Sequence, residues 1–201
     1  MKHYIGIAGT NSKASTNLKL MQYVKKHFNK DVDVELVDIS SLPVFFKGTA
    51  DQVPNEALEI AAKIEAADGV IIATPEYDHS IPAVLMNALA WLSYTKRPFI
   101  GKPVMIIGAS YGTLGASRAQ AHLRRILDAP ELSALVMPSS EYFLSHSLQA
   151  FDENGDLKDE QKVVELENLM KQFNTYIQFA KNVDVTARLN SSQAQYLKVE
   201  E

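Results

Sequence analysis

The sequence contains no cysteine, which excludes disulfide bonds, thiolate nucleophiles, cysteine-ligated zinc and iron–sulfur clusters. It also lacks a strong excess of charge of one sign: 20 Lys and Arg residues stand against 24 Asp and Glu residues, a net charge of -4. Nucleic-acid-binding domains are usually basic, and the basic pairs here, such as Lys25-Lys26 and Arg124-Arg125, are short. We therefore expect no nucleic-acid partner, and the sequence predicts no metal site.

Long hydrophobic runs are missing as well. The apolar run that follows Met1-Lys2-His3 is too short for a signal peptide or a membrane span, so we expect no membrane association and a cytoplasmic location. Hydrophobic residues make up 46% of the 201 residues and charged residues 22%, which is ordinary for a globular protein. This length is sufficient for one domain with a sizeable core.

What is present is an alternation of short apolar runs with amphipathic stretches. The continuous apolar runs predict buried strands over residues 4–8, 69–73, 103–108 and 132–137. Residues 32–37 alternate apolar and acidic side chains, which favours an edge strand. Helical spacing of apolar residues predicts helices over residues 15–28, 54–67, 82–94, 116–127 and 158–180. Ser80 is placed to cap the third of these helices.

Five strands that alternate with helices predict an α/β fold, a doubly wound parallel sheet with helices on both faces. We expect residues 1–181 to form this domain and residues 182–201 to form a polar tail that is disordered or wraps around a partner subunit. Such sheets bind ligands beyond the carboxyl ends of their strands. The loops over residues 9–17, 74–80 and 109–115 follow buried strands, so they are the candidate functional loops.

The first loop runs from Gly9 to Asn17 and is rich in hydroxyl and amide side chains. It precedes a helix, whose free N–H groups and positive dipole end favour an anion, phosphate above all. The loop is neither a G-x-G-x-x-G nor a P-loop sequence, and it has glycine only at Gly9, so a mononucleotide phosphate held by hydroxyls fits it better than a dinucleotide. Simple helix capping by Ser15 or Thr16 explains part of the same pattern.

The second and third loops carry features that suit a flat ligand. Tyr77 lies between Pro75 and Pro82 at a strand end, where an aromatic ring can pack on another ring, although the two prolines equally fit a rigid turn. The third loop, over residues 108–118, contains three glycines, which permit close backbone approach to a ligand but also fit a plain flexible turn. His79 is a candidate acid or base, and an exposed histidine without a role is the simpler alternative.

These motifs together resemble those of the NADPH-dependent FMN reductase family, which includes azoreductases, quinone reductases and chromate reductases. The family's G-S-x-R-x-x-S-x-N loop is matched here by Gly9, Thr10, Ser15 and Asn17. Its P-E-Y-N-x-S-x-P-x-x-L-K-N-A-x-D-W motif is matched by Pro75, Glu76, Tyr77, Ser80, Pro82, Leu85, Asn87, Ala88 and Trp91. Its S-x-G-x-x-G-G-x-R-x-x-x-x-L-R motif is matched by Ser110, Gly112, Gly115, Leu123 and Arg124, with Arg118 near or on the family's arginine.

The resemblance implies a flavodoxin-like five-stranded sheet of order 2-1-3-4-5 that binds FMN and takes electrons from NADPH or NADH. It implies a phosphate site made of Thr10, Asn11, Ser12, Ser15, Thr16 and Asn17. It implies that the flavin ring lies along Pro75, Glu76, Tyr77, Asp78, Ser110, Tyr111, Gly112, Thr113 and Gly115. No residue is assigned a catalytic role, because the flavin carries the chemistry.

The resemblance further implies a small-molecule electron acceptor, such as a flavin, quinone or azo compound, and a homodimer or homotetramer. Trp91 and the helix around Asn87 are candidates for the subunit interface, and a core position for Trp91 is the alternative. Ser12 stands where the family usually has arginine, so a fixed charge on the phosphate is missing, with Lys13 the nearest substitute. Asp78 replaces an asparagine.

Two other functions compete with a reductase. A flavodoxin-type electron carrier would bind FMN without turning over a substrate of its own, but such carriers tend to be strongly acidic and this chain is only modestly so. A flavin-free regulatory or interaction protein on the same scaffold is the third possibility, because a fold does not dictate a function. The replacement of arginine by Ser12 is its best support.

Overall fold

The computed structural model describes residues 1–49 and 52–185. Its strands are β1 (Lys2–Ala8), β2 (Val32–Val37), β3 (Gly69–Thr74), β4 (Pro103–Ala109), β5 (Leu135–Val136) and β6 (Phe143–Leu144). Its helices are α1 (Thr16–His27), α2 (Asn55–Ala66), α3 (Ala83–Tyr94), α4 (Ser117–Leu127) and α5 (Glu160–Ala180). The predicted helices are all present, with ends within two residues of those expected from the apolar spacing.

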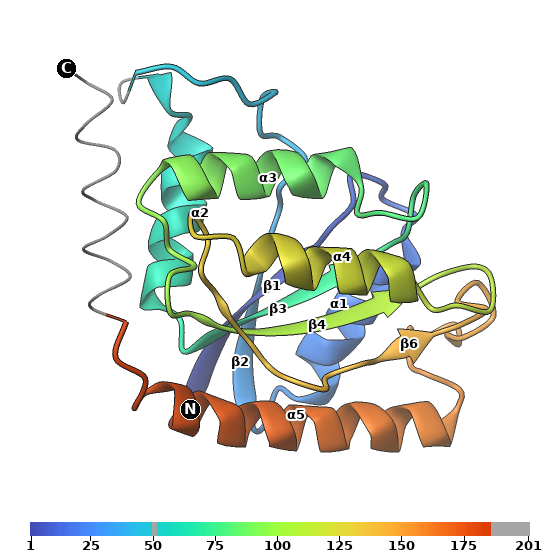
Figure 1. Cartoon of the computed structure of the whole chain (residues 1–201). Coiled ribbons are helices and arrows are strands. Elements are labelled where there is room, and N and C mark those ends of the chain that lie inside the picture. Colours follow the sequence, from blue (N-terminus) through green and yellow to red (C-terminus); the bar gives the residue numbers. More distant parts are fainter. Residues whose placement is uncertain (50–51, 186–201) are drawn as a thin grey trace.

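The sheet is parallel and has the order β2-β1-β3-β4-β5 (Figure 1). The register places Ile7 beside Ile72 and Ile72 beside Ile106, so the carboxyl ends of β1, β3 and β4 meet at one edge of the sheet. The predicted α/β doubly wound fold and its strand order are confirmed. The expected edge position of residues 32–37 is confirmed as well, because β2 ends the sheet on one side.

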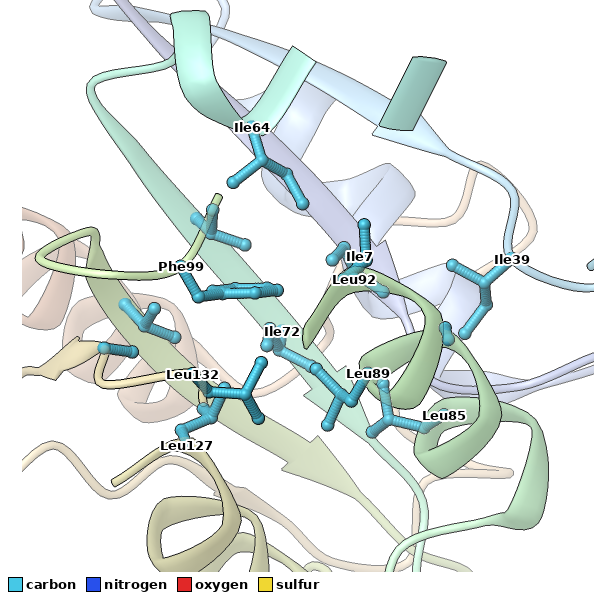
Figure 2. Close-up of a cluster of buried hydrophobic side chains, with 14 of the residues drawn as sticks. Ile7, Ile39, Ile64, Ile72, Leu85, Leu89, Leu92, Phe99, Leu127 and Leu132 are labelled. Atoms are coloured by element: carbon cyan, nitrogen blue, oxygen red, sulfur yellow. The ribbon is translucent and has the colours of Figure 1, made fainter. Parts of the chain in front are cut away.

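Each face of the sheet is covered by its own set of helices (Figure 1). Alternate residues of a strand point to opposite faces, and accordingly Ile5 and Ile72 pack toward α2, α3 and α4 while Tyr4 and Ile71 pack toward α1 and α5. Figure 2 shows the first of these two cores, in which apolar side chains of the sheet meet Leu85, Leu89 and Leu92 of α3. Burial on both faces explains why the central strands are continuous apolar runs.

The last edge of the sheet departs from the prediction. A single strand was expected over residues 132–137, but only Leu135 and Val136 pair with β4 there, and a further strand, β6, pairs with the other end of β4. Pro138 has no N–H to donate to a ladder, and Ser139 has a φ of 54°, so the edge strand breaks between the two pieces. The Arg124 side chain fills the break by donating to the carbonyls of Met137 and Ser140.

Two local predictions are decided by the structure. The prediction that Ser80 caps α3 is wrong: the residue at the cap position is Pro82, which makes no side-chain cap, and the Ser80 hydroxyl lies 2.7 Å from Nδ1 of His122. Trp91 is only 1% exposed, and its indole N–H donates to the carbonyl of Pro43, so it is a core residue within this chain. Most of the predicted tail lies outside the described residues, and the boundary after residue 181 stays a prediction.

Candidate functional site

A cleft of about 420 Å³ opens at the carboxyl ends of β1, β3 and β4. The three loops that follow these strands, together with the first turn of α4, supply its lining residues. They are Ser12, Ser15, Thr16, Asn17, Pro75, Glu76, Tyr77, Ala109, Ser110, Tyr111, Gly112, Thr113, Leu114 and Arg118. The cleft includes the position between β1 and β3 where the strand order reverses, which is where open α/β sheets bind ligands.

The first loop ends at the N-terminus of α1. Ser15 is the N-cap, and its hydroxyl accepts a hydrogen bond from the Asn17 N–H. The Thr10 hydroxyl accepts from the Ser12 N–H within the loop. The first-turn N–H groups of Thr16 and Leu18 have no partner within the described part of the chain, so they are free for an acceptor in the cleft.

Asn17 joins the first loop to the third. Its side chain is 1% exposed; its amide nitrogen donates to the Ala109 carbonyl at 2.9 Å, and its amide oxygen accepts from the Ala109 N–H, also at 2.9 Å. Both polar groups of the side chain are therefore used on the backbone at the end of β4. This bidentate clamp crosses 92 positions of sequence and fixes the first loop against the central strand.

Residues 144–147, called here the support segment, form hydrogen bonds with the backbone of the third loop. The carbonyl of Leu144 accepts from the Ser110 N–H, and the Ser147 N–H donates to the Ser110 carbonyl. The His146 N–H donates to the Gly112 carbonyl, and the Ser145 hydroxyl donates to the Thr113 carbonyl.

The support segment also reaches the first loop. The buried hydroxyls of Thr16 and Ser147 lie 2.8 Å apart. The first loop is thus tied to the third loop twice, directly through Asn17 and indirectly through Ser147.

The second loop contains a tight turn. Tyr77 and Ser80 exchange backbone hydrogen bonds, and the two residues between them, Asp78 and His79, have φ values of 50° and 64°. Positive φ at both central positions is the mark of a type I′ turn. Asparagine and aspartate both tolerate this conformation, so the turn accommodates Asp78 at the position where the motif of the resembling family has asparagine. The turn leaves the Tyr77 side chain 51% exposed at the rim of the cleft.

Glu76 connects the second loop to α4. One carboxylate oxygen accepts from Nε of Arg118 at 2.6 Å, and the other accepts from the N–H groups of Arg118 and Ala119. The N-cap residue of α4, Ala116, makes no side-chain hydrogen bond to the helix. The Glu76 carboxylate, from the second loop, takes over this capping role. Burial alone would raise the pKa of the Glu76 carboxyl, but the hydrogen bonds from Arg118 and Ala119 hold it below its ordinary value.

Two glycines of the third loop occupy contrasting positions. Gly115 has a φ of 55°, and a Cβ added there would lie 2.5–2.7 Å from atoms of Phe143, backbone atoms among them. A Cβ added at Gly112 would meet no protein atom within 4 Å. Gly115 is therefore required by the fold, whereas the protein itself places no steric demand on Gly112.

The structure places most of the predicted site residues on the cleft, namely Ser12, Ser15, Thr16, Asn17, Pro75, Glu76, Tyr77, Ser110, Tyr111, Gly112 and Thr113. Thr10, Asn11, Asp78 and Gly115 do not line it. Sequence reasoning did not name Ala109, Leu114 or Arg118 among the site residues, although all three lie in the predicted third loop and all three line the cleft. It missed the support segment altogether, because a two-residue strand and its following turn carry no periodic signal.

Comparison with known proteins agrees with this architecture. The model of the NADPH-dependent FMN reductase family matches residues 3–149. The chain belongs to this family. Relatives in it include an NADH:(hydroxy)cinnamate reductase subunit of Vibrio ruber, 54% identical over 85% of this chain and 85% of the relative. A subunit of an NADH-dependent flavin reductase of Lactobacillus johnsonii is 38% identical over 87% and 95% of the two chains.

A solved structure supports the same assignment. The NAD(P)H:acceptor oxidoreductase FerB of Paracoccus denitrificans superposes with a TM-score of 0.76 at 27% identity, over 90% of this chain and 98% of that one. The resemblance drawn from the three loops is therefore confirmed. As a member of the FMN reductase family, the chain is an oxidoreductase that uses FMN and a nicotinamide cofactor. Within residues 1–49 and 52–185, no helix combines the length and the apolar character needed to cross a membrane.

Proposed function

We propose that the cleft holds FMN with its phosphate at the N-terminus of α1 and its ring along the second and third loops, and that the protein passes electrons from NADH or NADPH to a small flavin, quinone or azo acceptor. When bound, the flavin supplies the chemistry of accepting a hydride and releasing electrons. The observation that carries the proposal is that three loops from separate strands line one cleft. Its volume lies within the range of pockets that hold small ligands, about 300–1,000 Å³.

The phosphate end of the cleft suits an anion without a fixed positive charge. Thr16 lines this end of the cleft, and the unpaired first-turn N–H groups and the positive dipole end of α1 are suited to stabilise an anion beside it. Ser12 adds a hydroxyl at the same end. Because the side chain of Asn17 is occupied by Ala109, we assign it to positioning this loop rather than to contact with the phosphate.

The ring end of the cleft suits a planar group. Tyr77 and Tyr111 are 51% and 59% exposed at its rim and can stack on an incoming flat donor or acceptor. The open space beside Gly112 leaves backbone free to approach a ring closely. Both features favour a site that accepts substrates of several kinds.

NADH is the donor we favour, because two of the relatives are named for NADH. Both of these relatives are also named as subunits. This observation favours a second candidate function, in which the electron acceptor is carried by a partner polypeptide. Turnover by the purified chain with free FMN or a quinone separates the two, since an electron-input subunit would reduce its own FMN quickly but turn over free acceptors slowly.

The proposal includes a homodimer or homotetramer and a cytoplasmic location, where NADH and NADPH are available. Met86 of α3 is 41% exposed and belongs to the helix that we expected at a subunit interface. Light scattering on the purified protein measures the assembly, and fractionation of cells measures the location. A monomer at working concentration would contradict the first of these expectations.

The decisive experiment is an anaerobic titration. Purified protein is loaded with FMN, and NADH or NADPH is then added while the visible spectrum is recorded. Rapid bleaching followed by reoxidation with a quinone is the expected result. FMN that stays oxidised would identify a carrier, and failure to bind FMN would contradict both functions.

A matched pair of variants locates the phosphate. Ser12→Arg restores the family's charge in the first loop and should tighten FMN binding but leave riboflavin, which lacks the phosphate, unchanged. Asn29→Arg adds the same charge beyond the other end of α1 and serves as the control. Equal effects of the two variants would contradict the assignment of the phosphate to this loop.

A further inference from the structure

Arg118 lies in the first turn of α4 and lines the cleft, as Tyr77 and Leu114 do. Its Nε is held by a carboxylate oxygen of Glu76 at 2.6 Å. The Glu76 side chain is 9% exposed, whereas that of Arg118 is 48% exposed. A buried carboxylate therefore anchors a half-exposed guanidinium, and the anchor uses only the inner edge of the group.

The outer edge of this guanidinium has no partner within residues 1–49 and 52–185. Neither terminal nitrogen of Arg118 donates a hydrogen bond to any residue in the described ranges. Arg118 is also the sole cationic side chain among the residues that line the cleft. A planar guanidinium with two free donors is suited to a phosphate or carboxylate group.

Arg118 stands apart from the phosphate end of the cleft. Helix α1 packs on one face of the sheet with Tyr4 and Ile71, and α4 packs on the other with Ile5 and Ile72 (Figure 1). An anion at the N-terminus of α1 and an anion at Arg118 are thus on opposite sides of the sheet edge. The Arg118 guanidinium is available for a second anionic group, one that does not belong to the FMN phosphate.

We propose that Arg118, anchored by Glu76, is an oxyanion-binding residue of the substrate site and recognises a phosphate of the nicotinamide donor or a carboxylate of the acceptor. The proposal rests on the FMN site proposed above. Glu76 acts on the substrate only through Arg118, so it is a positioning residue. Donor and acceptor occupy the exposed side of the same cleft in turn, so one guanidinium can serve either of them.

The test compares charged and neutral substrates in the FMN-loaded protein carrying Arg118→Ala. Arg125→Ala is the control, because Arg125 is an exposed residue of the same helix that does not line the cleft. The donors are NADH and N-benzyl-1,4-dihydronicotinamide, which has no phosphate. The acceptors are the carboxylated azo dye methyl red and the neutral 1,4-benzoquinone. Stopped-flow measurement of each half-reaction keeps donor and acceptor effects apart.

The expected result is a weakening of roughly 10- to 100-fold in the apparent affinity for the charged donor or the charged acceptor, as for the loss of one charge-assisted hydrogen-bonded pair. The neutral counterpart should be unchanged, and Arg118→Lys should recover part of the loss. A loss of apparent affinity for NADH alone would show that Arg118 binds a phosphate of the donor. A loss for methyl red alone would show that Arg118 binds the carboxylate of the acceptor. Equal effects on charged and neutral substrates, or no effect on any, would overturn the proposal.

The affinities for FMN and riboflavin separate this inference from the function on which it rests. In Arg118→Ala both affinities should equal those of the unsubstituted protein, because the FMN phosphate is placed at α1. A selective loss of FMN affinity would mean that Arg118 holds the cofactor phosphate and would overturn the inference. Failure of the unsubstituted protein to bind FMN would instead contradict the proposed function itself.

Discussion

The first and third loops line the same cleft but are held in place by different means. Residues Ser15, Thr16 and Asn17 of the first loop are buried, and their side chains fix the loop. Residues 111–114 of the third loop are exposed, and the support segment holds them by donating hydrogen bonds to the backbone carbonyls of Gly112 and Thr113. The first loop therefore forms an end of the cleft that its own buried side chains hold in place, called here the rigid cradle. The third loop forms a rim whose side chains are exposed and can contact substrates.

This difference teaches that a polar side chain in a binding motif can serve the site without touching the ligand. Asn17 and Glu76 both belong to motifs that suggested ligand contact. Asn17 uses its side-chain amide on the backbone of Ala109. Glu76 uses its carboxylate on the first turn of α4, where it accepts from the backbone N–H groups of Arg118 and Ala119 and from Nε of Arg118. Substitutions at such positions should lower the stability of the protein without FMN. Substitutions at true ligand contacts should not.

Asn17→Ala tests the rigid cradle and should have the largest effect. It strands both the N–H and the carbonyl of Ala109 in a buried site, and we expect a loss of about 3–4 kcal/mol in the free energy of unfolding, from two unsatisfied groups. Urea denaturation of the FMN-free protein measures it. Unchanged stability together with weaker FMN binding would instead make Asn17 a direct phosphate contact.

Gly115→Ala tests the base of the third loop. The added Cβ meets the backbone of Phe143 at a positive φ, so we expect a destabilisation of about 2–3 kcal/mol from the left-handed conformation and the overlap together. The thermal midpoint of the FMN-free protein reports this loss. A midpoint equal to that of the unsubstituted protein would show that the third loop is less constrained than its contacts indicate.

Thr16→Val breaks the hydroxyl pair between the first loop and the support segment. The two hydroxyls are buried at 2.8 Å, and the loss of one buried hydrogen bond costs about 1 kcal/mol. Ser147→Ala and the double variant complete a mutant cycle. Strict additivity of the two single effects would mean that the pair does not couple the loops.

Glu76→Gln tests the carboxylate between the second loop and α4 through pH. Burial would raise the pKa of the Glu76 carboxyl, but its hydrogen bonds to Arg118 and Ala119 bring it below the ordinary value of 4.5. Its ionised form therefore contributes stability above that value, and the contribution is lost as the pH falls through the lower pKa of the folded protein. The difference in the free energy of unfolding between the protein and this variant should narrow as the pH falls from about 7 to about 3. If the difference in the free energy of unfolding did not change with pH, the charge of Glu76 would not contribute to stability.

Gly112→Ala should have the smallest effect on stability and the most informative effect on binding. The open space at this position predicts a change within about 0.5 kcal/mol in the FMN-free protein. Weaker FMN binding in the same variant would therefore report the approach of the ligand to the backbone. Full FMN affinity would place the ring elsewhere in the cleft.

The apolar patterning of the sequence was sufficient to predict the doubly wound α/β fold, the helices on both faces and the three loops that form the cleft, whereas the order of the strands was predicted from the family resemblance. A strand buried on both faces appears in the sequence as a continuous apolar run, so strands such as residues 69–73 could be predicted without a structure. The hydrogen-bond partners of Asn17 and Glu76 could not be predicted, because Ala109 and Arg118 are distant from them in sequence. Ser80 was misassigned for the same reason, since its tertiary partner His122 competes with the local capping role.

The broken edge strand has a consequence for how copies of this chain can meet. An unpaired strand edge is a template for intermolecular pairing, and proteins blunt such edges with short strands, proline and charge. Here one edge is interrupted at Pro138 between β5 and β6, and the other, β2, carries Asp33 and Glu35. Both edges therefore disfavour sheet continuation across two copies, which lowers the risk of runaway strand addition.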